Sequence, residues 1–274
     1  MIILALESSG GVASVAIWKD GQVLTEGRGP FKVTHSETLM PLVQDAFNAV
    51  TAEGIDKESI DLIAVSGGPG SFTGLRIGNA TAKGLGFALK KDLIHVPTID
   101  AMAYNFKGSG KLIVPMMDAR RGQVYTGIYC FDGGELKTIK PGCAIEAVQL
   151  ISIINEIAGG KAEECSIPGE VIFLGDGAVE FREMIENGCN VPYEFANGDN
   201  ALQRASSVAR LAAVLAERGE IVKAGDEIPE YLRLSQAERI RQEQVNQAET
   251  DTSGRSDRVM HKQTNRGREQ ARNN

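Results

Sequence analysis

At 274 residues, with 42% of them hydrophobic, the chain is long enough for one large domain or two smaller ones with real cores, which excludes a wholly disordered protein. A formal net charge of -7 excludes a broad surface for coating nucleic acid, and no apolar run approaches the roughly 20 residues that span a bilayer. Four cysteines without a Cys-x-x-Cys pair, and a strand-like start without a basic flank or cleavage site, indicate the cytoplasm.

The first third of the chain is predicted to alternate strands with helices. Strands are expected over residues 2–6, 12–18 and 22–26, the last two joined by a turn at Asp20-Gly21. From Thr34 onward the apolar residues fall at helical spacing, which predicts a helix near residues 36–51. Thr34 and Glu37 can form a capping box there, whereas Pro41 is expected to kink the helix or to delay its start.

A glycine-rich loop then separates a buried strand over residues 62–65 from a helix that runs to Leu89. The loop glycines permit backbone conformations that other residues avoid, and Ser71 or Thr73 can cap the helix. Free N–H groups at this point could hold a phosphate or a carboxylate. The loop matches no common nucleotide fingerprint, however, because it lacks both the Gly-Lys-Ser/Thr of a P-loop and the third glycine of a dinucleotide site.

Two rows of small residues run along this helix. One row is Gly74, Gly78, Ala82 and Gly86, and beside it lie Ala80, Gly84 and Ala88. Since each glycine inside a helix costs roughly 1 kcal/mol relative to alanine, a neighbouring surface is expected to pack very closely against it. That surface is either the chain's own sheet or a partner, and the missing nucleotide fingerprint favours a docking surface over residues 73–88.

The second half of the chain is expected to repeat the first at lower fidelity, after a strand over 93–96 and a short helix to Tyr104. Its predicted elements are strands over 112–117, 123–131 and 171–174, and helices over 147–157, after Gly177 and over 206–218. The predicted parts are a first subdomain (1–106), a second, smaller one (107–236) whose helix 206–218 can pack back on the first, and a flexible polar tail (237–274). The tail is locally basic, so it is either a solvated end without a role or a loose contact for RNA or an acidic partner.

The sequence shows none of the residue patterns that usually mark a metal-dependent or nucleophilic catalytic site. His35, His95 and His261 form no His-x-x-x-His pair and no Gly-x-Ser-x-Gly elbow is present, so neither a metal site nor a peptidase nucleophile is predicted. Three carboxylates, Glu7, Asp118 and Asp176, do follow predicted strands, where an open sheet presents ligand-binding residues. They suit a nucleotide cleft between domains or, alternatively, ordinary turns.

Five segments of the chain occur in a recognisable order. They are Leu4-Ala-Leu-Glu-Ser-Ser9, His35-Ser-Glu-Thr-Leu-Met-Pro41, Gly68-Pro-Gly-Ser-Phe-Thr-Gly-Leu-Arg-Ile-Gly78, Asp118-Ala-Arg-Arg-Gly-Gln-Val-Tyr125 and Tyr231-Leu-Arg233. Together they resemble the TsaB family, also called YeaZ, over residues 1–238, and the tail is not covered. One departure is Glu7, where members of the family usually have aspartate.

The resemblance implies an α/β chain with an actin-like, Hsp70-like ATPase (ASKHA) fold of two related subdomains, each with a mixed sheet flanked by helices. It implies a non-catalytic scaffold and activator in the synthesis of N6-threonylcarbamoyladenosine (t6A) in tRNA. The implied partners are a metal-dependent TsaD-like paralogue and a TsaE-like ATPase, with a homodimer when the chain is alone and tRNA reached only through the complex. No cofactor of its own is implied, and the resemblance leaves open whether a nucleotide binds at a partner interface. The alternative is a stand-alone ATP-dependent phosphotransferase or ATPase of the same fold.

The resemblance also implies a docking surface on the helix after the first hairpin and on the glycine helix. The implied partner-binding residues are His35, Ser36, Leu39, Met40, Pro41, Leu42, Thr73, Gly74, Arg76, Ile77, Gly78, Thr81 and Ala82. The candidate cleft for a nucleotide or partner comprises Glu7, Ser8, Asp118, Arg120, Gly175 and Asp176. No catalytic residue and no metal ligand is predicted.

Overall fold

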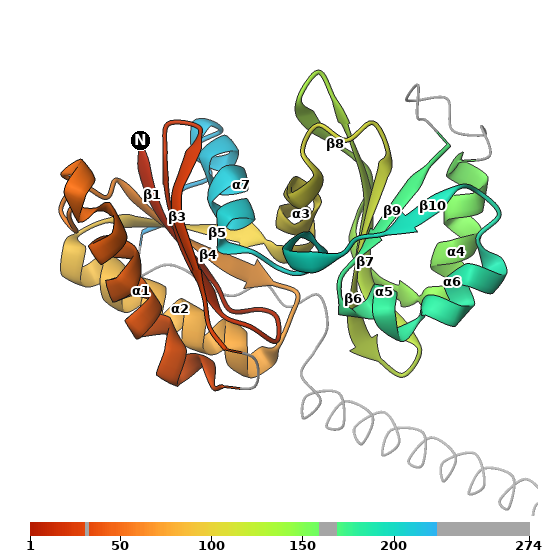
Figure 1. Ribbon diagram of the computed structural model, residues 1–274, viewed down its shortest axis with the longest axis horizontal. Helices are drawn as coiled ribbons and strands as arrows, with labels where there is room; N and C mark the ends of the chain where they lie inside the picture. Colours follow the sequence, from red (N-terminus) through yellow and green to blue (C-terminus); the bar gives the residue numbers. More distant parts are fainter. Residues whose placement is uncertain (31–32, 159–168, 224–274) are drawn as a thin grey trace, which may run out of the picture. The chain divides into compact units, whose positions relative to one another are not determined.

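The computed structural model describes residues 1–30, 33–158 and 169–223, and these ranges hold two five-stranded sheets with helices on their faces (Figure 1). The predicted tail, residues 237–274, and the Tyr231-Leu-Arg233 segment lie outside the described residues. Within those ranges, none of the helices is both long enough and apolar enough to cross a membrane.

The first sheet has the strand order β3-β2-β1-β4-β5. Its strands are β1 (Ile2–Glu7), β2 (Ser14–Lys19), β3 (Gln22–Arg28), β4 (Leu62–Gly68) and β5 (Asp92–Pro97). β1 pairs antiparallel with β2 and parallel with β4, which in turn pairs parallel with β5. The parallel strands are short apolar runs without alternation because helices cover both of their faces.

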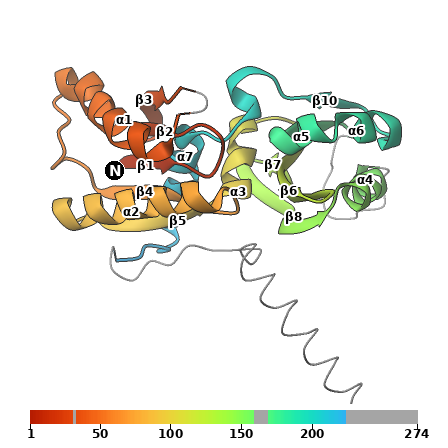
Figure 2. The same ribbon diagram turned by 90° about the horizontal axis from the view of Figure 1, so that it is seen from below.

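Helices sandwich the first sheet. They are α1 (His35–Val50), which is followed by the 3-10 helix η1 (Thr51–Glu53), α2 (Phe72–Leu89), α3 (Thr98–Ala103) and α7 (Ala205–Glu217). Alternate residues of β1 serve the two layers: Leu4 and Leu6 pack with α1 and α2, whereas Ile3 and Ala5 pack with α3 and α7. α1 and α2 therefore lie on the same face of the sheet, where they contact each other (Figure 2).

The second sheet has the order β10-β9-β6-β7-β8. Its strands are β6 (Leu112–Arg120), β7 (Gln123–Asp132), β8 (Glu135–Glu146), β9 (Val171–Leu174) and β10 (Tyr193–Phe195). Its helices are α4 (Ala147–Glu156), α5 (Asp176–Glu180) and α6 (Arg182–Gly188). These three helices cover one face, and α3 fills the other by packing Ile99 and Met102 with Tyr129. The short α3 thus belongs to the packing of both sheets.

The start of α1 narrows one expectation and corrects another. Pro41 lies inside the helix, which nevertheless begins at His35 and is therefore not delayed. A proline at this point cannot donate a hydrogen bond to the Glu37 carbonyl, and Pro41 lies on the exposed side of the helix. The capping box is also wrong, because the Thr34 hydroxyl donates to the Glu37 carboxylate at 2.7 Å instead of accepting a bond from a backbone N–H.

Two strands of the second sheet had no clear sequence signal. β8 is a long outer strand whose Lys137, Lys140 and Pro141 break the alternation of apolar and polar residues. β10 has only three residues. Both lie at the edges of the sheet, where one side of the strand needs no partner and the residue pattern is least constrained.

Candidate partner-docking face

The glycine loop forms the predicted strand, turn and helix. β4 ends at Gly68, which adopts a φ of 112°, a conformation that favours glycine. The hydroxyl of Ser71 accepts a hydrogen bond from Gly74 N at 3.2 Å and so caps α2 as predicted. The geometry of this turn fixes where α2 starts relative to the sheet.

The loop does not present an open phosphate cradle, because the chain's own residues cover it. A β-carbon at Gly70 would lie 2.6 Å from the carbonyl oxygen of Ser9, and the Ser71 N–H donates to that same oxygen at 2.8 Å. On the other side, a β-carbon at Gly67 would lie 2.5 Å from Nδ1 of His95. Burial, followed by the charge of Lys83, lowers the pKa of His95 to about 4, so this imidazole is neutral at physiological pH.

The first row of small residues on α2 packs against the chain itself. A β-carbon at Gly74 would overlap the Ser8 carbonyl oxygen, and one at Gly78 would overlap the Ser8 hydroxyl. Ala82 is fully buried among the apolar residues beneath α1 and α2, and Gly86 is buried as well. The interpretation of this row as a surface for a partner is therefore wrong, because the closely packed neighbour is Ser8, which directly follows β1.

The second row lies on the opposite, exposed side of α2. Ala80, Gly84 and Ala88 are exposed, and a β-carbon at Gly84 would meet nothing within 4 Å. Two aromatic side chains flank this row: Phe72 is 40% exposed and Phe87 is 86% exposed. The Arg76 guanidinium lies over the Phe72 ring, 3.9 Å from its centroid.

The partner-binding residues implied on α1 divide by exposure. Ser36, Met40 and Pro41 are exposed, whereas Leu39 is buried in the core beneath the helix. His35 and Leu42 are half-buried. His35 is held by its Nε2, which lies 3.0 Å from the carbonyl oxygen of Gly10 in the N-terminal turn. Of this set, the exposed three are available to a partner.

The residues implied on α2 divide in the same way. Thr73 and Arg76 are exposed, Ile77 and Thr81 are half-buried, and the Thr81 hydroxyl donates to the Ile77 carbonyl at 2.8 Å. The sequence interpretation omitted Phe72 and Phe87. A signal for Phe72 was present, because positions 72, 76, 80 and 84 follow one another at four-residue spacing and so share a helix face.

These observations define a solvent-exposed surface that we call the α1–α2 face. It comprises Ser36, Met40, Pro41, Phe72, Thr73, Arg76, Ala80, Gly84, Phe87 and Ala88. Its small side chains permit close approach of another backbone, and its large apolar side chains offer area to bury. Its chemistry suits binding of a protein rather than of a small polar ligand.

The N-terminal turn of the candidate cleft is closed. Glu7 is 1% exposed, and its carboxylate accepts hydrogen bonds from Ser9 N at 2.5 Å and Ser9 Oγ at 2.6 Å. Ser8 is buried too, and its N–H donates to Ser66 Oγ at 3.2 Å. A β-carbon at Gly10 would lie 2.5 Å from Oε1 of Gln203, which covers the turn from outside. Glu7 and Ser8 therefore do not line an open cleft, contrary to expectation.

The other candidate cleft residues form a separate group at the ends of β6 and β9. Asp176 Oδ1 accepts from Asp118 N at 3.3 Å, and Asp118 accepts from Arg120 N at 2.7 Å and forms an ion pair with its guanidinium at 3.0 Å. Gly175 has a φ of 99° and lies against the Met116 carbonyl, where no β-carbon fits. The structure thus brings Asp118, Arg120, Gly175 and Asp176 together. Among the described residues, no group of three or more His, Cys, Asp or Glu side chains is placed to hold a metal ion.

Comparison with known proteins agrees with this architecture. A family model described as "TsaD: tRNA N6-adenosine threonylcarbamoyltransferase" matches residues 32–241. The tRNA threonylcarbamoyladenosine biosynthesis protein TsaB of Bacillus subtilis is 29% identical over 238 residues, 87% of this chain and 96% of that protein. TsaB of Escherichia coli is 30% identical over 238 residues, 85% of this chain and 95% of that protein.

A solved structure from Pseudomonas aeruginosa, titled as an uncharacterized protein with similarity to peptidase YeaZ, shares the fold. It has a TM-score of 0.67 and 24% identity, and the match covers 85% of this chain and 99% of that chain. The class of protein defined by the two mixed, helix-flanked sheets is that of the ASKHA folds, as predicted. The chain belongs to the TsaB (YeaZ) family of that class, which confirms the resemblance seen in its motifs.

Replacing Glu7 by glutamine tests the closed turn. Burial raises the pKa of Glu7 above its ordinary value of 4.5, against the opposing hydrogen bonds from Ser9, so the folded chain holds this proton more tightly than the unfolded chain. The stability that Glu7 contributes is therefore present when the pH is below the pKa of Glu7 in the unfolded chain. It is lost as the pH rises through the pKa of Glu7 in the folded chain. Glu7→Gln does not titrate and keeps an acceptor for Ser9. Its free energy of unfolding, measured in urea, is expected to rise relative to the native chain between acidic and neutral pH, and a difference independent of pH would contradict this.

Proposed function

We propose that the chain is a scaffold and activator subunit in the synthesis of t6A in tRNA and that it docks a metal-dependent TsaD-like paralogue through the α1–α2 face. Support for the pathway comes from the relatives, whose names assign them to tRNA threonylcarbamoyladenosine biosynthesis. The docking role rests on one observation: a helix of the chain exposes a row of small residues next to Phe87, which is 86% exposed.

The arrangement of small and large residues on this face favours a helical partner. Gly84 has open space above it, so a partner helix can approach the α2 backbone closely. Met40 from α1 is 50% exposed, and it adds a flexible apolar side chain that can adapt to a partner. Burial of exposed aromatic and methionine side chains is the usual source of affinity at protein interfaces.

A scaffold rather than a catalyst fits the state of the candidate chemical groups. The carboxylate of Glu7 accepts hydrogen bonds from Ser9 within its own turn, and Gln203 covers that turn. Asp118 accepts a hydrogen bond from the backbone N–H of Arg120 and forms an ion pair with its guanidinium. We therefore propose that the chain has no nucleotide of its own and that any nucleotide binds at the interface with its partner.

The other proposed partners follow from the same assignment. A TsaE-like ATPase joins the heterodimer, tRNA is reached only through the complex, and the complex acts in the cytoplasm. When the paralogue is absent, two copies of the chain pair through the same α1–α2 face, because an exposed apolar surface is covered by whichever complementary surface is available.

A second function, that of a stand-alone ATPase or phosphotransferase, is favoured by one group of residues. Asp118, Arg120, Gly175 and Asp176 are gathered at the ends of two strands, where open α/β sheets commonly bind ligands. Under this alternative the purified chain turns over ATP by itself, and Asp118→Ala abolishes the turnover. Under the scaffold proposal the purified chain shows no turnover.

The leading proposal is tested in cells. A tagged chain is expected to co-purify with the His-x-x-x-His paralogue, and depletion of the chain is expected to remove most t6A from tRNA. A chain that co-purifies only with itself would overturn the proposed partner, and t6A that persists after depletion would overturn the proposed role.

A further inference from the structure

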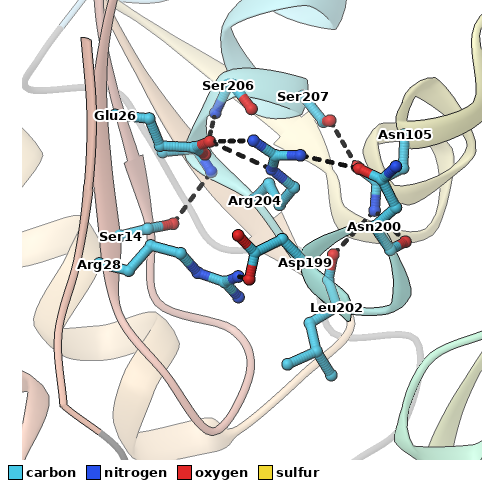
Figure 3. Close-up of polar contacts among 11 residues, drawn as sticks. Ser14, Glu26, Arg28, Asn105, Asp199, Asn200, Leu202, Arg204, Ser206 and Ser207 are labelled. Atoms are coloured by element: carbon cyan, nitrogen blue, oxygen red, sulfur yellow. Dashed lines mark hydrogen bonds and ion pairs between the residues drawn. The ribbon is translucent and has the colours of Figure 1, made fainter. Parts of the chain in front are cut away.

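The chain passes twice between its two sheets. The first crossing runs from α3 through the 3-10 helix η2 (Tyr104–Phe106) to β6, and the second runs from β10 through the 3-10 helix η4 (Gly198–Ala201) to α7. In Figure 3, side chains of the second crossing meet side chains of β3, and Asn105 of the first crossing meets the second crossing. Any rotation of one sheet relative to the other has to take place at these two crossings.

The second crossing is fastened at both of its ends. On the side of the second sheet, Gly175 N donates to the Ala201 carbonyl at 2.7 Å. On the side of the first sheet, Ala205 N donates to the hydroxyl of Ser14 at 3.0 Å. Two residues before Ala201, Asp199 forms an ion pair with Arg28 of β3 at 2.6 Å. The crossing is thus held along its length rather than only where it joins the sheets.

A largely buried ion pair anchors the start of α7. Arg204 Nε donates to Glu26 Oε2 at 3.1 Å and its Nη2 donates to the same oxygen, while Ser206 N donates to Glu26 Oε1 at 2.9 Å. The two side chains are 24% and 10% exposed. Burial alone would raise the pKa of Glu26, but the hydrogen bonds from Arg204 and Ser206 lower it overall. Separating this pair would leave a charge buried without its partner.

Asn105 of the first crossing ties that crossing to the second. Its side-chain Nδ2 donates to the carbonyl oxygens of Asn200 at 2.9 Å and Leu202 at 2.8 Å, and its Oδ1 accepts from Ser207 Oγ at 2.5 Å (Figure 3). The Arg204 guanidinium also donates to Asn200 Oδ1 at 2.8 Å. One asparagine therefore uses both ends of its amide to bind η4 and α7 together.

We propose that Glu26, Asn105 and Arg204 form a clasp that fixes the two sheets relative to each other, so that this chain does not open and close as a hinge. Rotation at the crossings would have to break the bonds that Asn105 and Arg204 make to the second crossing. Both side chains bind Asn200, so these bonds break together, and Glu26 holds the Arg204 guanidinium in the position that its bond requires. The clasp makes the chain a rigid body for whatever binds it. This inference does not depend on the identity of the partner.

Distances between the two sheets test the clasp. A donor and an acceptor dye, attached through noncanonical amino acids at the exposed positions Ala49 on α1 and Val179 on α5, report the separation of the sheets in single molecules. The native full-length chain is expected to show one narrow distribution of transfer efficiency. Asn105→Ala is expected to add a second, resolved population, and Glu26→Gln, which keeps the shape of the side chain, is expected to do the same.

Asn155 supplies the matched control. Its Nδ2 donates to the Gly188 carbonyl at 2.8 Å and its Oδ1 accepts from Asn190 N at 2.8 Å, so Asn155→Ala removes similar bonds away from both crossings. This variant is expected to keep the narrow distribution. The proposal is overturned by a broad distribution in the native chain, by narrow distributions in both clasp variants, or by an equal effect of Asn155→Ala. If Asn105→Ala does not fold, Glu26→Gln decides.

Discussion

An arginine in place of Gly84 is expected to weaken binding of the TsaD-like paralogue strongly while the chain stays folded. The position is open to solvent, so the free chain accommodates the side chain, whereas a partner helix that approaches the α2 backbone would collide with it and bury its charge unpaired. A loss of roughly 100-fold in affinity, about 3 kcal/mol, is expected. Titration calorimetry with the purified paralogue measures it.

Two further variants give this experiment its controls. Gly84→Ala adds only a methyl group and is expected to bind within a few-fold of the native chain. Val179→Arg places the same charge on α5, where Val179 is 68% exposed outside the α1–α2 face, and is expected to leave binding unchanged. Native affinity in Gly84→Arg would show that the partner docks elsewhere.

Leucine at Gly78 is expected to destabilise the chain strongly, in contrast to leucine at Gly84. The β-carbon of a leucine at Gly78 would overlap the Ser8 hydroxyl and lie 3.4 Å from Val65 Cγ2, so the turn after β1 would have to move. Overpacking of this kind costs about 1–3 kcal/mol and sometimes more. At Gly84 no neighbour lies within 4 Å, and the better helix propensity of leucine is expected to add roughly 0.5–1 kcal/mol.

Urea unfolding followed by circular dichroism distinguishes the two leucine variants. The expected order of the free energies of unfolding is Gly84→Leu above the native chain and Gly78→Leu well below it. A Gly78→Leu chain as stable as the native one would mean that the first row of small residues does not pack against Ser8.

Local sequence patterns predicted the centre of this fold well. The glycine loop, the Ser71 cap and the position of α2 follow from the apolar run of β4, the turn chemistry and the helical spacing after it. The motifs identified the family and, through it, the ASKHA fold. The four-residue spacing also revealed both rows of small residues on α2, but not which row faces inward. That choice depends on the sheet onto which the helix packs, and rows of equally small residues carry no hydrophobic contrast to indicate it.

Contacts between residues far apart in the sequence could not be predicted from local sequence patterns. Glu26 and Arg204 are separated by 178 residues, and Asn105 and Leu202 by 97. No periodicity relates such positions, because only the tertiary fold brings them together. The prediction that Glu7 lines an open cleft failed for a different reason. Its place after a strand was predicted correctly, but the sequence does not show that the carboxylate turns back onto Ser9 instead of facing a ligand.

The central claim is that the chain serves t6A synthesis by docking and not by chemistry of its own. It is tested most directly by reconstituting t6A formation on tRNA from the TsaD-like paralogue, the TsaE-like ATPase, a threonylcarbamoyl donor and one form of this chain. The claim predicts near-native rates with Asp118→Asn and Glu7→Gln, and a rate with Gly84→Arg that falls to that of the mixture without the chain. Loss of t6A formation with Asp118→Asn while Gly84→Arg remains active would contradict it.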